Sequence, residues 1–126
     1  HITTFGGHPV ACASSAAALR LLEKVDWKAL EMRGARLENQ LKKHSAVKAV
    51  RRLGYFIAVD MESPEAIHFC VEHARKNGLL IFYFLSTPNS FRIAPPLIIS
   101  DEELNEGMTL LNHAFDAWVL QRVSHP

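Results

Sequence analysis

The spacing of apolar residues changes along this chain, and that change is what most limits the folds open to it. Between residues 26 and 44, apolar side chains recur at steps of three and four, which places them on one face of a helix. Between residues 55 and 61, two sets of side chains alternate, which is the spacing of a strand. Helical spacing returns after residue 100. The chain therefore mixes helices and strands.

Four helices are predicted. An Ala-rich helix spans residues 10–25, and the second runs from its N-cap Asp26 to about residue 44. The third starts at Ser63 and ends at Asn77-Gly78, and the fourth begins at a capping box formed by Ser100 and Glu103. Their buried stripes are predicted as Ala17, Ala18, Leu21 and Leu22; Trp27, Leu30, Gly34, Leu37 and Leu41; Ile67, Cys70, Val71 and Ala74; and Leu104, Met108, Leu111, Phe115 and Trp118.

The strands are predicted at residues 47–53, 55–61, 79–84 and 91–94, the first two on either side of Gly54. The order is then helix, helix, strand, strand, helix, strand, strand, helix. This order predicts an α+β fold: a small antiparallel or mixed sheet with helices packed on one face, preceded by a long helical segment.

Composition argues against several classes of function. The 126 residues include 14 basic and 13 acidic ones, and nucleic-acid binding would need a basic excess. No apolar run approaches the roughly 18 residues of a membrane span, and no signal peptide is visible. Cys12 and Cys70 are interpreted as buried or half-buried free thiols. We therefore expect a cytoplasmic protein that binds neither nucleic acid nor membrane.

The loop before the first helix carries one candidate site. Thr3 and Thr4 offer hydroxyl donors, Gly6 and Gly7 allow close approach of the backbone, and Pro9 opens a helix whose N-terminus favours negative charge. This combination suits a phosphate. Taken alone, a Gly-Gly pair before a helix is more often a simple turn.

Arg92 is the second candidate. It lies on a short predicted strand just before Pro95-Pro96, where its guanidinium is placed for a bidentate grip on a carboxylate. Without further context, a surface arginine with its stem on apolar neighbours explains the same pattern.

Both candidates lie in segments that resemble one family. HITTFGGHPVACASSAAALRLLE is similar to the segment that follows the cofactor lysine in class III pyridoxal-phosphate (PLP) aminotransferases. FRIAPPLIISDEELNEG resembles the segment of these enzymes that binds the substrate carboxylate, and VKAVRRLGYFIAVDM resembles their paired strands. The resemblance covers essentially the whole chain in the right order, and implies the small domain of a fold-type-I enzyme.

The resemblance implies roles for single residues. Thr4 corresponds to the threonine that contacts the cofactor phosphate in the neighbouring subunit, and Thr3, Gly6 and Gly7 to the loop that shapes the phosphate site. Arg92 corresponds to the arginine that binds the substrate α-carboxylate. His8, often asparagine in the family, is given a loop-shaping role. Arg51 and Arg52 replace part of a glycine-rich stretch.

Some parts of such an enzyme are not found in this sequence. The Schiff-base lysine and the acid that pairs with the pyridine nitrogen belong to the large domain. We expect the lysines here to be solvated, at Lys24, Lys28, Lys42, Lys43, Lys48 and Lys76. Cys70 and His73 share a helical face but lack further ligands, so we expect neither a metal site nor a catalytic residue.

We therefore expect a piece of a longer protein, also because a dense motif follows within four residues of His1. Residues 1–25 would form the phosphate loop and connecting helix, and residues 26–126 the small domain. The expected partners are a large N-terminal domain, a homodimer partner, an amino acid or ω-amine and a 2-oxo acid. The expected activity is amino-group transfer by the whole enzyme, with this chain inactive alone. The alternative is a non-catalytic module that binds amino acids or another protein.

Overall fold

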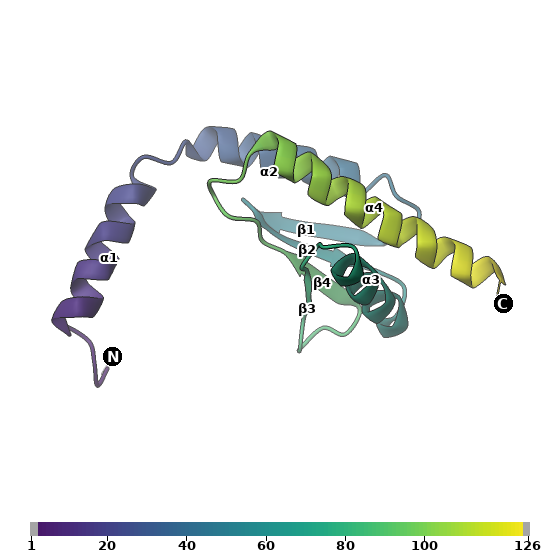
Figure 1. Cartoon of the computed structure of the whole chain (residues 1–126), viewed down its shortest axis with the longest axis horizontal. Coiled ribbons are helices and arrows are strands. Elements are labelled where there is room, and N and C mark those ends of the chain that lie inside the picture. The colour runs from purple at the N-terminus through teal and green to yellow at the C-terminus, as the bar shows by residue number, and fades with distance from the viewer. Residues whose placement is uncertain (1–2, 125–126) are drawn as a thin grey trace.

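A computed structural model describes residues 3–124 of the chain. The predicted order of elements is confirmed (Figure 1). The elements are α1 (Pro9–Leu22), α2 (Trp27–Leu41), β1 (Ala49–Leu53), β2 (Phe56–Asp60), α3 (Pro64–Lys76), β3 (Phe82–Tyr83), β4 (Ser90–Ile93) and α4 (Asp101–Ser124).

The strands form one antiparallel sheet in the order β1-β2-β4-β3. A hairpin joins β1 to β2 through Gly54, whose φ of +57° lies in the left-handed region that glycine tolerates. β4 then pairs with β2, and the short β3 lies at the edge. The predicted α+β class is therefore confirmed, and the sheet is antiparallel.

The core lies between the sheet and the helices α2, α3 and α4, which cover one of its faces (Figure 1). One cross-strand row, of Val50, Val59 and Phe91, points into it. The helices contribute Leu30, Leu37, Leu41, Ala66, Ile67, Cys70, Ala74, Leu104, Met108, Leu111, Ala114 and Phe115. The predicted stripes of these three helices are thus buried apart from Trp27, Val71 and Trp118, while Ala66 and Ala114 are buried although they were not predicted.

Side chains cap the starts of α2 and α4, as the sequence predicts. The Asp26 carboxylate accepts a hydrogen bond from the Ala29 amide at 2.9 Å. At α4, the Ser100 hydroxyl accepts from the Glu103 amide at 3.1 Å, while the Glu103 carboxylate accepts from the Ser100 amide at 2.8 Å. This reciprocal pair is the predicted capping box.

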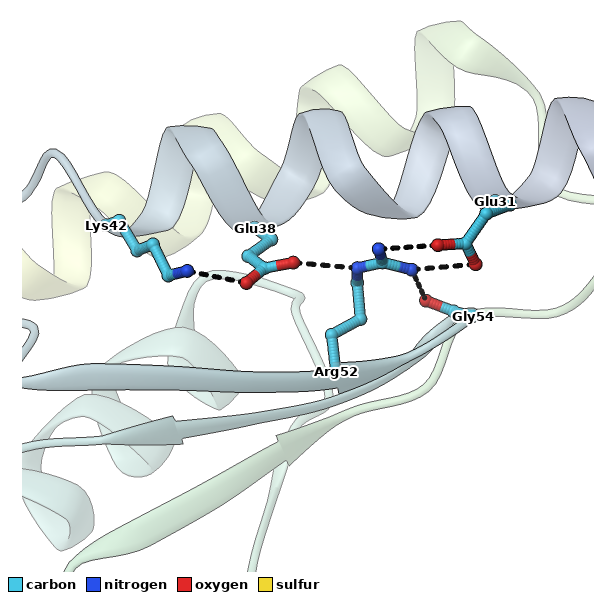
Figure 2. A network of polar contacts seen from close by, with 5 residues as sticks. All are labelled: Glu31, Glu38, Lys42, Arg52 and Gly54. Carbon is cyan, nitrogen blue, oxygen red and sulfur yellow. Dashed lines mark hydrogen bonds and ion pairs between the residues drawn. The ribbon is translucent and has the colours of Figure 1, made fainter.

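A network of charges fixes α2 to the β1–β2 hairpin (Figure 2). Arg52 donates to both carboxylate oxygens of Glu31, at 2.7 and 2.9 Å, to Glu38 at 2.9 Å and to the Gly54 carbonyl at 3.2 Å. Lys42 donates to the other oxygen of Glu38 at 2.6 Å, as the i,i+4 spacing predicts. The Arg52 side chain is only 12% exposed, so this arginine is part of the packing between helix and sheet.

Gly34 lets these two elements approach closely. A Cβ at this position would lie 2.5 Å from the Gly54 carbonyl oxygen and 3.0 Å from an Arg52 nitrogen. Both distances are below ordinary contact, so the hydrogen bonds of Arg52 depend on a glycine here. Arg52, which stands in place of part of a glycine-rich stretch, thus has two acidic partners on α2, Glu31 and Glu38.

Three expectations about packing are wrong. The run 79–84 forms a strand only at Phe82–Tyr83, where it pairs with Arg92 and Phe91 of β4. Trp27, the first residue of α2, is 54% exposed. Cys12 is exposed rather than half-buried.

The predicted buried stripe of α1 is also exposed. None of its residues is buried, and the helix projects away from the sheet (Figure 1). Within residues 3–124, no helix combines the length and the apolar character that crossing a membrane requires.

Candidate functional site

The loop that precedes α1 is a tight turn made possible by two glycines. The His8 amide donates to the Phe5 carbonyl at 3.1 Å, which closes the turn. Gly7 has a φ of +84°, in the left-handed region that other residues rarely adopt. A Cβ on Gly6 would collide with the Thr3 hydroxyl, so glycine is what allows that hydroxyl to fold over the turn.

The donors in this loop fit a phosphate group. Thr3 and Thr4 are exposed, and His8, the N-cap residue of α1, makes no side-chain capping bond in the described structure. The first amides of the helix are therefore open, and the first turn contains no acidic residue. Hydroxyl donors beside an uncapped helix N-terminus are the groups that favour a bound phosphate.

Arg92 lies on β4, on the sheet face opposite the helices. It belongs to a cross-strand row with Arg51, Ala58 and Phe82, one residue from each strand. Its guanidinium carbon lies 5.8 Å from the centre of the Phe82 ring, which is within the range of a cation–π contact. The ring thus supports the arginine from the neighbouring strand.

Arg92 differs from most other arginines because no acid among residues 3–124 forms an ion pair with it. Six of the eight arginines form ion pairs within residues 3–124, and Arg92 and Arg20 do not. The shallow cleft lined by Arg92 also contains Glu72 and Arg75, but these two pair with each other at 2.7 Å. Arg92 therefore offers an unpaired guanidinium beside apolar walls, which suits a carboxylate ligand.

Arg51, on the same row, is held by its own partners. It donates to Asp60 at 2.6 Å and to the buried Ser90 at 3.3 Å, and the Ser90 hydroxyl donates to Asp60 as well. Burial alone would raise the pKa of Asp60, but the bonds from Arg51 and Ser90 hold that pKa below its ordinary value. The carboxylate stays charged, so Arg51 is not free to bind a ligand as Arg92 is.

The chain does not bring its two candidate sites together. The loop with Thr3, Thr4, Gly6 and Gly7 lies at the far end of α1, and Arg92 lies in the sheet (Figure 1). Phe82 was not among the predicted site residues. The apolar run from Leu79 to Phe84 shows no alternation, so only the pairing of β3 with β4 places Phe82 beside Arg92.

Other reactive side chains are poorly placed for chemistry. All six lysines are exposed, as predicted. Burial raises the pKa of the Cys70 thiol to about 12, so this thiol is protonated at neutral pH. No three His, Cys, Asp or Glu side chains come close enough to hold a metal ion in the part of the chain that the structure describes.

Comparison with known proteins places this chain in a family. Residues 1–115 match the model of the class III aminotransferases. The chain is 40% identical over 119 residues to ornithine aminotransferase 2 of Staphylococcus aureus, covering 91% of this chain and 29% of that protein. It is 35% identical over 111 residues to the acetylornithine aminotransferase of Haemophilus ducreyi, covering 88% and 28%.

A solved structure agrees. The ornithine aminotransferase of Toxoplasma gondii, which holds PLP at partial occupancy in its active site, superposes with a TM-score of 0.81. It shares 31% sequence identity, and the match covers 97% of this chain and 30% of that one. The chain therefore belongs to the class III aminotransferases, and it spans less than a third of the length of these relatives.

Proposed function

We propose that this chain is the C-terminal part of a PLP-dependent aminotransferase, which moves an amino group from an amino acid or ω-amine to a 2-oxo acid. The match of residues 1–115 to class III aminotransferases carries the proposal. Residues 1–25 would form the phosphate loop and connecting helix, and residues 26–126 the small domain. The rest of the enzyme, including the lysine that binds the cofactor, would come from a large N-terminal domain.

The loop residues would hold the phosphate of PLP. Thr3 and Thr4 would donate hydrogen bonds from their hydroxyls, while Gly6 and Gly7 keep the backbone free to approach. The N-terminus of α1 would add its favourable potential. We assign Thr4 to the active site of a neighbouring subunit, which makes a homodimer part of the proposal. When bound, PLP would supply the electron-withdrawing ring that stabilises charge at the substrate carbon.

Arg92 would orient the substrate. Its guanidinium would bind the α-carboxylate through two parallel hydrogen bonds, and the Phe82 ring would hold the arginine plane in place. Because Arg92 has no acidic partner among residues 3–124, binding a carboxylate breaks no ion pair described here. We propose that the chain alone is inactive, because its six lysines are all exposed.

The test compares substrates with and without a carboxylate. In the longer protein that contains this chain, Arg92→Gln should lower kcat/KM for a 2-oxo acid acceptor by roughly ten- to a hundredfold, since a hydrogen bond to a charged group contributes about 1.5–3 kcal/mol. An aldehyde acceptor without a carboxylate should be nearly unaffected. Arg36→Gln, which removes a surface ion pair between α2 and Asp101 at the start of α4, serves as the matched control.

Two outcomes would count against the proposal. Equal losses for both acceptors would remove the carboxylate-binding role from Arg92. A 126-residue chain that bound amino acids by itself, as a clean monomer, would instead favour the alternative of a binding module.

A further inference from the structure

An apolar cavity of about 110 Å³ lies between α4 and the inner face of the sheet. Part of its lining is buried, including Leu37, Ile57 and Leu111. Its rim includes the half-buried Pro95 and Gly107. The lining thus includes residues that solvent reaches in part, so one end of the cavity lies at the surface.

The lining selects for ligands without charge or strong polarity. Glu103 is the one ionisable residue on the lining, and its carboxylate already accepts the Ser100 amide at 2.8 Å. The other lining residues are aliphatic, proline, glycine or methionine. A polar ligand would lose its hydration without gaining partners, and cavities of this kind stay dry and take apolar guests.

Gly107 lines the cavity without a side chain. A Cβ on Gly107 would meet Leu79 Cδ1 at 3.7 Å, which is ordinary van der Waals contact, so a methyl group fits there. The glycine lies within the helix α4, where alanine is the more stable residue by roughly 0.5–1 kcal/mol. Neither a turn nor a close approach of backbone requires a glycine at this position.

We propose that this cavity is a binding site for compact apolar molecules, namely xenon and hydrocarbons no larger than benzene. Its volume is somewhat below the roughly 150 Å³ of an engineered cavity that binds both. The site is separate from the phosphate loop, and its occupation does not depend on the proposed aminotransferase activity.

Methyl NMR of the full 126-residue chain under increasing xenon pressure tests the proposal. Ile57, Ile81, Ile93 and Ile99 line the cavity, whereas the buried Ile67 and the exposed Ile98 do not. Saturable shifts of the four lining methyls, with Ile67 and Ile98 unmoved, are expected. Shifts that are absent, or that spread evenly over all six residues, would overturn the proposal.

Two variants link these shifts to the cavity itself. Gly107→Ala should reduce the xenon response of all four methyls, because its Cβ occupies part of the space. Asn105→Ala, at an exposed position of the same helix, raises helix propensity without entering the cavity and should leave the response intact. An unchanged response in Gly107→Ala would contradict the assignment of the binding site.

Discussion

The helices α1 and α2 are almost equal in length, yet they differ completely in their surroundings. α2 has 15 residues and buries Leu30, Gly34, Leu37 and Leu41 against the sheet. α1 has 14 residues and buries none. Both have the composition and start signals of a helix, so local sequence accounts for both. Burial, in contrast, depends on what the rest of the chain places beside each helix.

The exposed residues of α1 indicate where its partner belongs. Val10, Leu19 and Leu21 are each more than 60% exposed. The predicted stripe of Ala17, Ala18, Leu21 and Leu22 is exposed as well. An isolated helix of this length is marginal in water. The core cluster is built from residues that follow α1, and we therefore expect α1 to find its contacts outside the described residues. This agrees with the proposed large domain and dimer partner.

The largest expected effect comes from removing matched phenylalanines in the two regions. Phe91 is fully buried on β4, and Phe91→Ala should lower the free energy of unfolding by about 3–5 kcal/mol. Phe5 is 79% exposed in the loop before α1, so Phe5→Ala should change the unfolding free energy of the same chain very little. Urea unfolding of both variants measures the difference. Similar losses would show that residues 3–22 are packed after all.

The contact between α2 and the β1–β2 hairpin should be the next most sensitive. Gly34→Ala forces a methyl to within 2.5 Å of the Gly54 carbonyl and should destabilise the chain by about 1–3 kcal/mol. Gly107→Ala is the matched control, because its Cβ meets only ordinary contact and should stabilise by roughly 0.5–1 kcal/mol. Thermal or urea unfolding of both variants tests the opposite signs, and a neutral Gly34→Ala would rule out the close approach.

The parts of the fold that sequence predicted are those set by neighbouring residues. Helix starts at Asp26 and Ser100 follow from capping chemistry, and the strands around Gly54 follow from alternation and a turn. The length of β3 could not be predicted, because it depends on how much of that run β4 pairs with.

The candidate site divides in the same way. Residue type and motif order identified the loop from Thr3 to Gly7 and the arginine on β4. The absence of an acidic partner for Arg92 among residues 3–124, and the ring of Phe82 beside it, result from strand pairing and could not be predicted from spacing. The hydrogen bonds of Arg52 to Glu31 and Glu38 could not be predicted either, because these two residues of α2 are distant in sequence from the hairpin.

Low pH should have a smaller effect on the stability of the fold. Hydrogen bonds from Arg52 lower the pKa of Glu31, and those from Lys42 and then Arg52 lower the pKa of Glu38. A carboxylate with a lowered folded-state pKa stabilises the fold above its unfolded pKa of about 4.3, and this contribution is lost as pH falls through the folded value. The urea midpoint should therefore fall between about pH 5 and pH 3.

Arg52→Met should make this decline shallower, because Glu31 then loses its cationic partner. Arg75→Met, which removes an ion pair with Glu72 between two half-exposed side chains, should alter the decline less. Parallel pH profiles for the parent chain and Arg52→Met would show that the network contributes no acid-sensitive stability.

Amide hydrogen exchange of the monomeric 126-residue chain tests the contrast between its two regions most directly. Amides of α1 should exchange at rates close to those of an unfolded peptide, while the buried turns of α2 and the central strands β2 and β4 should be strongly protected. In the longer protein, α1 should become protected through the partner surfaces proposed above. Protection of α1 equal to that of α2 in the isolated chain would contradict the account, because α1 would then be stable without any partner.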